Sequence, residues 1–142
     1  MEKINEAYLD TSVFATSILD TGINGEKARN IIDGVQNKHV DGYTSALTFD
    51  ETVFIVRKFR GFDNSITAGD DFLGINNLNL IEVDYGIIAA AQELIKKYRI
   101  KPRDAIHAAC TMHKNIKTIV SDDADFDSVK ELERKSFKEF KI

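Results

Sequence analysis

Acidic residues stand where apolar segments of this chain end or where helix-like segments begin. They are Asp10, Glu51, Asp104, Asp122, Asp123 and Asp125. Carboxylates that cluster repel one another and raise each other's pKa, so such a cluster needs a compensating positive charge. Mg²⁺ and Mn²⁺ supply it, because these hard cations prefer oxygen ligands. A bound ion of this kind activates water and stabilises charge on a phosphoryl oxygen. These residues therefore indicate metal-assisted phosphodiester hydrolysis.

Each acidic residue also has a purely structural interpretation. Asp10 precedes Thr11 and Ser12, either of which could cap a helix. Thr48-Phe-Asp-Glu51 matches a capping box, in which the glutamate bonds a backbone N–H. The helix macrodipole alone favours Asp104 in a first helical turn, and the acids after residue 121 could form a solvated turn. The functional interpretation depends on all of them meeting at one edge of one sheet.

The elements that would bring these residues together follow from the alternation of apolar and helix-like segments, which predicts an α/β layered domain with a mainly parallel sheet. The predicted strands are residues 7–10, 41–45, 78–83 and 118–121, with a further edge strand at 136–140. The predicted helices are residues 26–38, 48–60, 65–76, 85–98, 102–113 and 127–134. Functional groups of such sheets collect beyond the carboxyl ends of the strands, where the helices also begin.

Composition places further bounds on the class of protein. The 142 residues fit one domain, expected to span residues 1–142. No apolar run approaches the ~20 residues that cross a bilayer, and the first residues contain no signal-peptide core, so we expect a cytoplasmic protein without membrane contact. Cys110 is the single cysteine, which excludes an internal disulfide and a cysteine-based zinc cluster.

The net charge of −4 argues against a protein that holds nucleic acid by overall positive charge. A local basic strip nevertheless precedes Asp104, and its Lys101 and Arg103 could guide an RNA backbone. The alternative for this strip is a solvated helix end. His107 lies one helical turn beyond Asp104. We expect it to be a packed or hydrogen-bonded helix residue, with contact to the acidic site as the alternative.

Four motifs, taken in order, resemble a PIN domain of the VapC toxin-like type, a family of small metal-dependent ribonucleases. The motifs are YLDTSVF, SALTFDETVF, RDAIHAA and IVSDDADFD, and together they cover nearly the whole chain. The resemblance implies a three-layer α/β/α sandwich whose parallel sheet has the strand order 3-2-1-4-5. It also implies a Mg²⁺ or Mn²⁺ cofactor held by acidic side chains.

The resemblance assigns roles residue by residue. Asp10, Glu51 and Asp104 match three family positions, and the pattern T/S-x-D-x-D-F aligns Asp123 and Asp125 with the remaining acids, leaving Asp122 variable. The implied catalytic residues are Asp10, Glu51, Asp104 and Asp123. The implied metal ligands are Asp10, Asp104, Asp123 and Asp125. Glu51 either helps to ligate the ion or orients the attacking water. The expected supporting residues are Thr11, Ser12 and Ser121.

The function that the resemblance implies is a metal-dependent endoribonuclease, the toxin of a type II toxin–antitoxin pair. Its partners would be an RNA substrate, a small antitoxin and a second copy of the chain. Residues 66–75 could form the antitoxin groove, the homodimer face or a loosely packed core helix. The alternatives are an RNA-processing nuclease without a toxin role and a catalytically degenerate PIN-like binding module. A phosphoacceptor receiver domain and a haloacid-dehalogenase-type phosphatase lack their required residues here.

Overall fold

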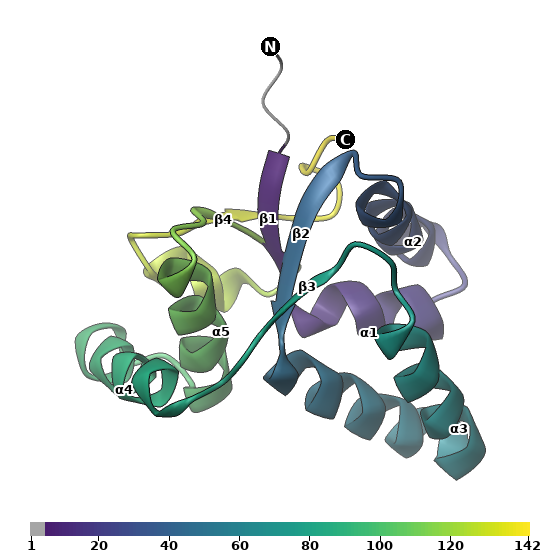
Figure 1. Ribbon diagram of the computed structural model, residues 1–142, viewed down its shortest axis with the longest axis horizontal. Helices are drawn as coiled ribbons and strands as arrows, with labels where there is room; N and C mark the ends of the chain where they lie inside the picture. Colours follow the sequence, from purple (N-terminus) through teal and green to yellow (C-terminus); the bar gives the residue numbers. More distant parts are fainter. Residues whose placement is uncertain (1–4) are drawn as a thin grey trace.

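The computed structural model describes residues 5–142, in which five parallel strands form one sheet with the order β3-β2-β1-β4-β5. The strands are β1 (Asn5–Leu9), β2 (Val40–Ser45), β3 (Asn79–Ile81), β4 (Thr118–Val120) and β5 (Glu133–Lys135). This confirms the expected α/β class and the strand order. Figure 1 shows the central strands β1 and β2 side by side between two groups of helices.

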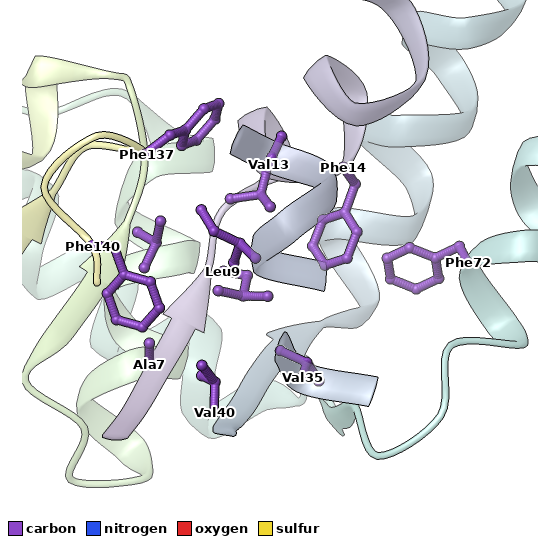
Figure 2. Close-up of a cluster of buried hydrophobic side chains, with 12 residues drawn as sticks. Ala7, Leu9, Val13, Phe14, Val35, Val40, Phe72, Phe137 and Phe140 are labelled. Carbon is purple, nitrogen blue, oxygen red and sulfur yellow. The ribbon is translucent and has the colours of Figure 1, made fainter. Parts of the chain in front are cut away.

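Alternation along β1 supplies both faces of the sheet with core residues. Ala7 and Leu9 belong to a cluster with α1 (Thr11–Leu19) and α2 (Ile23–Gln36), and Figure 2 shows this cluster extending to Phe72 and Phe140. Tyr8 points to the opposite face, where it packs with α4 (Tyr85–Tyr98) and α5 (Pro102–His113). Side chains on a strand alternate between faces, so one strand anchors all three layers. The expected sandwich is confirmed.

Local signals set the ends of α4 and α5, whose bounds match the prediction. Asp84 caps α4 by accepting a hydrogen bond of 3.0 Å from the backbone N–H of Ile87. Arg99 ends that helix in the left-handed region at φ 59°. Pro102 occupies the first position of α5, where its missing N–H costs nothing. No helix within residues 5–142 has the length and hydropathy to cross a bilayer.

The predicted helices 48–60 and 65–76 are the two halves of α3 (Ala46–Leu73). They meet at Gly61, whose φ of 85° and ψ of 177° interrupt the helical geometry. This backbone conformation is essentially restricted to glycine. Figure 1 shows the first half leaving the sheet edge and the second half turning back toward α1. The kink therefore brings the second half of α3 to the α1 side of the molecule.

The predictions for the C-terminal segment, a helix at 127–134 and an edge strand at 136–140, are wrong. A short 3₁₀ helix, η1 (Ala124–Ser128), comes earlier, and the edge strand is β5. Backbone N–H groups of Glu133 and Ser121 pair β5 with β4. Phe137 and Phe140 are both buried, at helical rather than alternating spacing, and residues 136–140 form a turn that carries these rings into the core.

Candidate active site

Asp10 is held where β1 gives way to α1. Its backbone N–H donates to the carbonyl of Val120 at 3.1 Å, which keeps it in register with β4. The residue is only 6% exposed, and its side chain caps α1 by accepting from the backbone N–H of Ser12 at 3.5 Å. The alternative in which Thr11 or Ser12 caps the helix is therefore wrong, because the N-cap residue is Asp10. Capping leaves the second carboxylate oxygen of Asp10 available for other partners.

Ser121 connects the ends of β1 and β4. Its Oγ donates to Asp10 Oδ2 at 2.7 Å and accepts from the backbone N–H of Asp123 at 2.9 Å. Ser12 Oγ lies 3.4 Å from the same hydroxyl. Ser121 and Ser12 thus contact the acidic site at the positions expected of supporting residues, and Ser121 makes the shorter contact with Asp10.

Three carboxylates meet beyond the end of β4. Single oxygens of Asp104, Asp123 and Asp125 all lie within 4.8 Å of one another. Asp104 Oδ2 is buried and has no hydrogen-bond partner within the described chain. Burial, followed by the charges of Asp123, Asp10 and Asp125, raises the pKa of Asp104 to about 6. An unpartnered oxygen among repelling carboxylates fits a hard divalent cation, which prefers this donor type.

Asp122, in the same SDDADFD stretch, faces away from this cluster. Asp122 Oδ1 accepts a hydrogen bond of 3.2 Å from the backbone N–H of Phe137, so it secures the C-terminal turn. This agrees with its alignment at a variable family position. Asp123 caps η1 by accepting from the backbone N–H of Asp125 at 2.9 Å.

Glu51 does not form the capping box that its sequence context suggests. The helix α3 begins earlier, with Ser45 as its N-cap residue. Glu51 Oε1 instead accepts from Thr11 Oγ1 at 3.0 Å and lies 2.6 Å from His107 Nε2. Burial raises the pKa of Glu51, but the hydrogen bond and charge of His107 outweigh it, with Thr11 and Arg103 assisting, so that the net shift is downward.

His107 is a buried, hydrogen-bonded helix residue, as expected, and it also contacts the acidic site. It is 1% exposed, and its Nε2 lies 3.5 Å from Asp10 Oδ1 in addition to its contact with Glu51. Burial lowers the pKa of His107, but the hydrogen bond to Glu51 and the charges of Asp10, Glu51 and Asp104 raise it overall. The sequence signal for this contact was the one-turn spacing from Asp104.

The two expected RNA contacts lie on either side of these acids. Lys101 Nζ forms an exposed ion pair of 3.4 Å with Asp125 Oδ2. Arg103 lines a small cavity of about 130 Å³ together with Asp50, Glu51, Phe54 and Ile55. The Phe54 side chain is 62% exposed. A basic group thus flanks the acidic cluster toward α3 as well as toward η1.

A larger cavity, of about 550 Å³, lies between α1, α2 and the second half of α3. We call it the α1–α3 groove. Its apolar lining residues are Phe14, Ile18, Ile32, Ala68, Phe72 and Ile75. The charged residues Arg29, Asp33, Asp70 and Asp71 also line it. Residues 66–75 therefore contribute both to the core, through Phe72, and to the wall of this groove.

Comparison with known proteins agrees with this architecture. Ribonuclease VapC2 of Methanocaldococcus jannaschii is 25% identical over 133 residues, covering 84% of this chain and 89% of the relative. The crystal structure of VapC20 from Mycobacterium tuberculosis, a sarcin-ricin loop cleaving toxin, superposes with a TM-score of 0.73 at 18% identity, covering 87% of this chain and 95% of that one.

A second solved structure, VapBC2 from Rickettsia felis bound to a DNA fragment from their promoter, gives a TM-score of 0.73 at 18% identity. The match covers 92% of this chain and 98% of that one. At these identities the two crystal structures establish the fold. The model of the PIN domain family matches residues 7–132, which span β1 through the turn before β5. The chain therefore belongs to the PIN domain family.

Proposed function

We propose that this protein is a Mg²⁺- or Mn²⁺-dependent endoribonuclease. The observation that carries the proposal is the convergence of Asp104, Asp123 and Asp125 within 4.8 Å, with one buried oxygen that has no hydrogen-bond partner among residues 5–142. Membership of the PIN domain family and the relative named ribonuclease VapC2 support the same reaction class. Asp104 belongs to the first turn of α5, whereas Asp123 and Asp125 follow β4, so two separate elements contribute the carboxylates to one site.

Each acidic side chain has a stated task in this proposal. Asp10, Asp104 and Asp123 hold the ion, and Asp125 completes the ligand set. A bound divalent cation lowers the pKa of water and offsets charge that develops on a phosphoryl oxygen. Glu51, ionised and fixed through Oε1, orients the attacking water in line with the scissile bond. Ser121, Thr11 and Ser12 keep the carboxylates of Asp10 and Glu51 in place.

The RNA backbone passes between the two basic flanks of the site. Lys101 and Arg103 contact phosphates on either side of the scissile bond, which places the substrate without reading its sequence. Because the overall charge is −4, these local cations contribute the favourable term for an anionic substrate. The exposed ring of Phe54, in the cavity beside Arg103, offers a surface on which an unpaired base can stack.

We further propose that the protein is the toxin of a type II pair, active in the cytoplasm as a homodimer. The α1–α3 groove takes an apolar segment of a small antitoxin, whose charged residues pair with Arg29, Asp33, Asp70 and Asp71. Solved relatives support this view, since they include VapBC2 from Rickettsia felis and a toxin–antitoxin complex from Klebsiella pneumoniae. A short DNA-binding protein encoded beside this gene is the expected partner.

Cleavage of total tRNA and rRNA tests the reaction itself. The purified protein is incubated with these RNAs in Mn²⁺, in Mg²⁺ and in EDTA, and the cut sites are mapped. We expect cleavage with either ion, none in EDTA, and none with Asp10→Asn. Asp63→Asn, which changes an exposed acid of α3 outside the acidic cluster and the Arg103 cavity, is the matched control and retains activity. Cleavage that survives both EDTA and Asp10→Asn contradicts the metal mechanism.

A further inference from the structure

A buried chain of side chains runs from the sheet to the acidic site. His107 Nδ1 lies 2.7 Å from the Tyr8 hydroxyl, and that hydroxyl donates to Ser45 Oγ at 2.8 Å. On the other side of the ring, Nε2 lies 2.6 Å from Glu51 Oε1. Tyr8 is fully buried and His107 is 1% exposed, so water does not compete for these contacts. The orientation of the ring is therefore fixed at both ends.

Donor counting assigns the protons of the ring. The Tyr8 hydroxyl has one proton, which it gives to Ser45 Oγ, so it accepts from Nδ1–H of His107. Glu51 Oε1 accepts from Thr11 Oγ1 and, as a carboxylate oxygen, has no proton to give, so Nε2–H donates to it. The imidazole consequently donates at both nitrogens, toward the core on one side and toward the site on the other.

This arrangement constrains one oxygen of Glu51 and leaves the other available. Both hydrogen bonds to the carboxylate end on Oε1. A glutamate side chain has several rotatable bonds, and fixing them in one conformation costs conformational entropy. Two donors on Oε1 hold the carboxylate in one orientation, so Oε2 keeps a defined position relative to Asp10, which His107 also contacts at 3.5 Å.

We propose that Tyr8 and His107 are positioning residues that hold Glu51 Oε1, so that Oε2 presents a fixed acceptor to the water or ion at the reacting centre. The assignment rests on the proposed nuclease function. It gives the histidine of the RDAIHAA motif a task that neither metal ligation nor core packing supplies, because its polar atoms are used in directed contacts at both ends.

Two substitutions test the contacts of the two ring nitrogens of His107 separately. The amide of His107→Gln reaches the former Nε2 position and keeps a donor for Glu51, whereas that of His107→Asn reaches the Nδ1 position and keeps one for Tyr8. We expect His107→Asn to lower kcat about 10–100-fold, as loss of a ligand-orienting partner does, with KM changed less than about threefold. His107→Gln retains more activity than His107→Asn.

A double-mutant cycle shows whether the effect passes through Glu51. In the Glu51→Gln background, we expect His107→Asn to lower kcat by less than about threefold. The carboxylate that His107 positions is already replaced there. Thr111→Val is the control for the helix, since among residues 5–142 Thr111 Oγ1 bonds only the carbonyl of His107, at 2.8 Å. This variant retains kcat while losing thermal stability. Equal losses from His107→Asn in both backgrounds overturn the proposal.

Ring-nitrogen NMR gives a readout that needs no RNA cleavage. In ¹⁵N-histidine-labelled, metal-free protein at about pH 7, we expect both ring nitrogens of His107 to be protonated. Glu51→Gln shifts the Nε2–H signal, and Tyr8→Phe shifts the Nδ1–H signal and serves where His107 variants do not fold. The proposal is overturned if only one ring nitrogen of His107 is protonated and the ring signals do not shift in Glu51→Gln. If wild-type protein cleaves no RNA, the proposed function fails. The NMR result still shows whether His107 donates to Glu51.

Discussion

Ser121 Oγ donates a hydrogen bond of 2.7 Å to Asp10 Oδ2, joining two strand ends that are 111 residues apart in sequence. The same oxygen accepts from the backbone N–H of Asp123 at 2.9 Å. One fully buried hydroxyl thus fixes the distance between the acids that follow β1 and β4. The relationship explains why a small polar residue directly follows β4.

Removing this hydroxyl tests its importance. We expect Ser121→Ala to lower the free energy of unfolding by about 1–3 kcal/mol, because Asp10 Oδ2 and the Asp123 N–H both lose a buried partner. The kcat of RNA cleavage also falls in Ser121→Ala, whereas Ser121→Thr keeps the hydroxyl and much of the activity. Urea denaturation and kcat measurements check both variants. Equal stability and activity in Ser121→Ala and wild type would contradict this role.

We expect Asp104 to lower the free energy of unfolding of the metal-free protein at neutral pH. Its pKa of about 6 in the folded state lies above the ordinary 3.8, so the folded state binds more protons between these values. The penalty is absent below about pH 4, grows as the pH rises through 6, and is complete at pH 7. Since Asp104 is only half-buried, screening reduces the penalty, and we expect Asp104→Asn to stabilise the metal-free protein by about 1 kcal/mol at pH 7.

Mn²⁺ should reverse this order. A ligand that binds only the folded state at 100 times its Kd stabilises by about 2.7 kcal/mol, which wild type gains and Asp104→Asn largely loses. Urea denaturation at pH 4 and pH 7, with EDTA or with Mn²⁺, measures the effect. A variant that is less stable than wild type in EDTA at pH 7 would disprove the repulsion that the geometry indicates.

The α1–α3 groove can be tested apart from catalysis. Ile18 lines it and is 40% exposed, so Ile18→Glu places a charge in the groove without disturbing the core. We expect this variant to keep its RNase activity and to escape inhibition by the small protein encoded beside the gene. Ile88→Glu, at a 45% exposed isoleucine on α4, is the matched control and stays inhibited. Equal inhibition of both variants would place antitoxin binding elsewhere.

Gly61 tests the origin of the kink in α3. An added Cβ meets no heavy atom within 4 Å, so any cost of Gly61→Ala comes from the backbone conformation at φ 85°. We expect a loss of about 1–3 kcal/mol in unfolding free energy. Gly86→Ala, in α4 at helical geometry, should instead gain about 0.5 kcal/mol. Urea denaturation of both variants checks the opposite signs, and a stabilising Gly61→Ala would contradict the argument.

The parts of the fold that follow from local patterns could be predicted from the sequence. Pro102 and the spacing of apolar residues gave the bounds of α5, and parallel strands brought their carboxyl ends to one edge. The role of His107 could not be predicted in the same way, because its partners Tyr8 and Glu51 are 99 and 56 residues away. The C-terminal turn was mistaken for a strand because the core contacts of Phe137 and Phe140 are also non-local.

Titration of metal-free protein with Mn²⁺ by calorimetry tests the central claim, that the converging carboxylates form a divalent cation site. Wild type is compared with Asp104→Asn, which alters the buried unpartnered oxygen, and with Asp50→Asn outside the cluster. We predict saturable binding to wild type and Asp50→Asn, weakened about 100-fold by Asp104→Asn. Equal affinity in all three proteins, or no binding to wild type, would contradict the account.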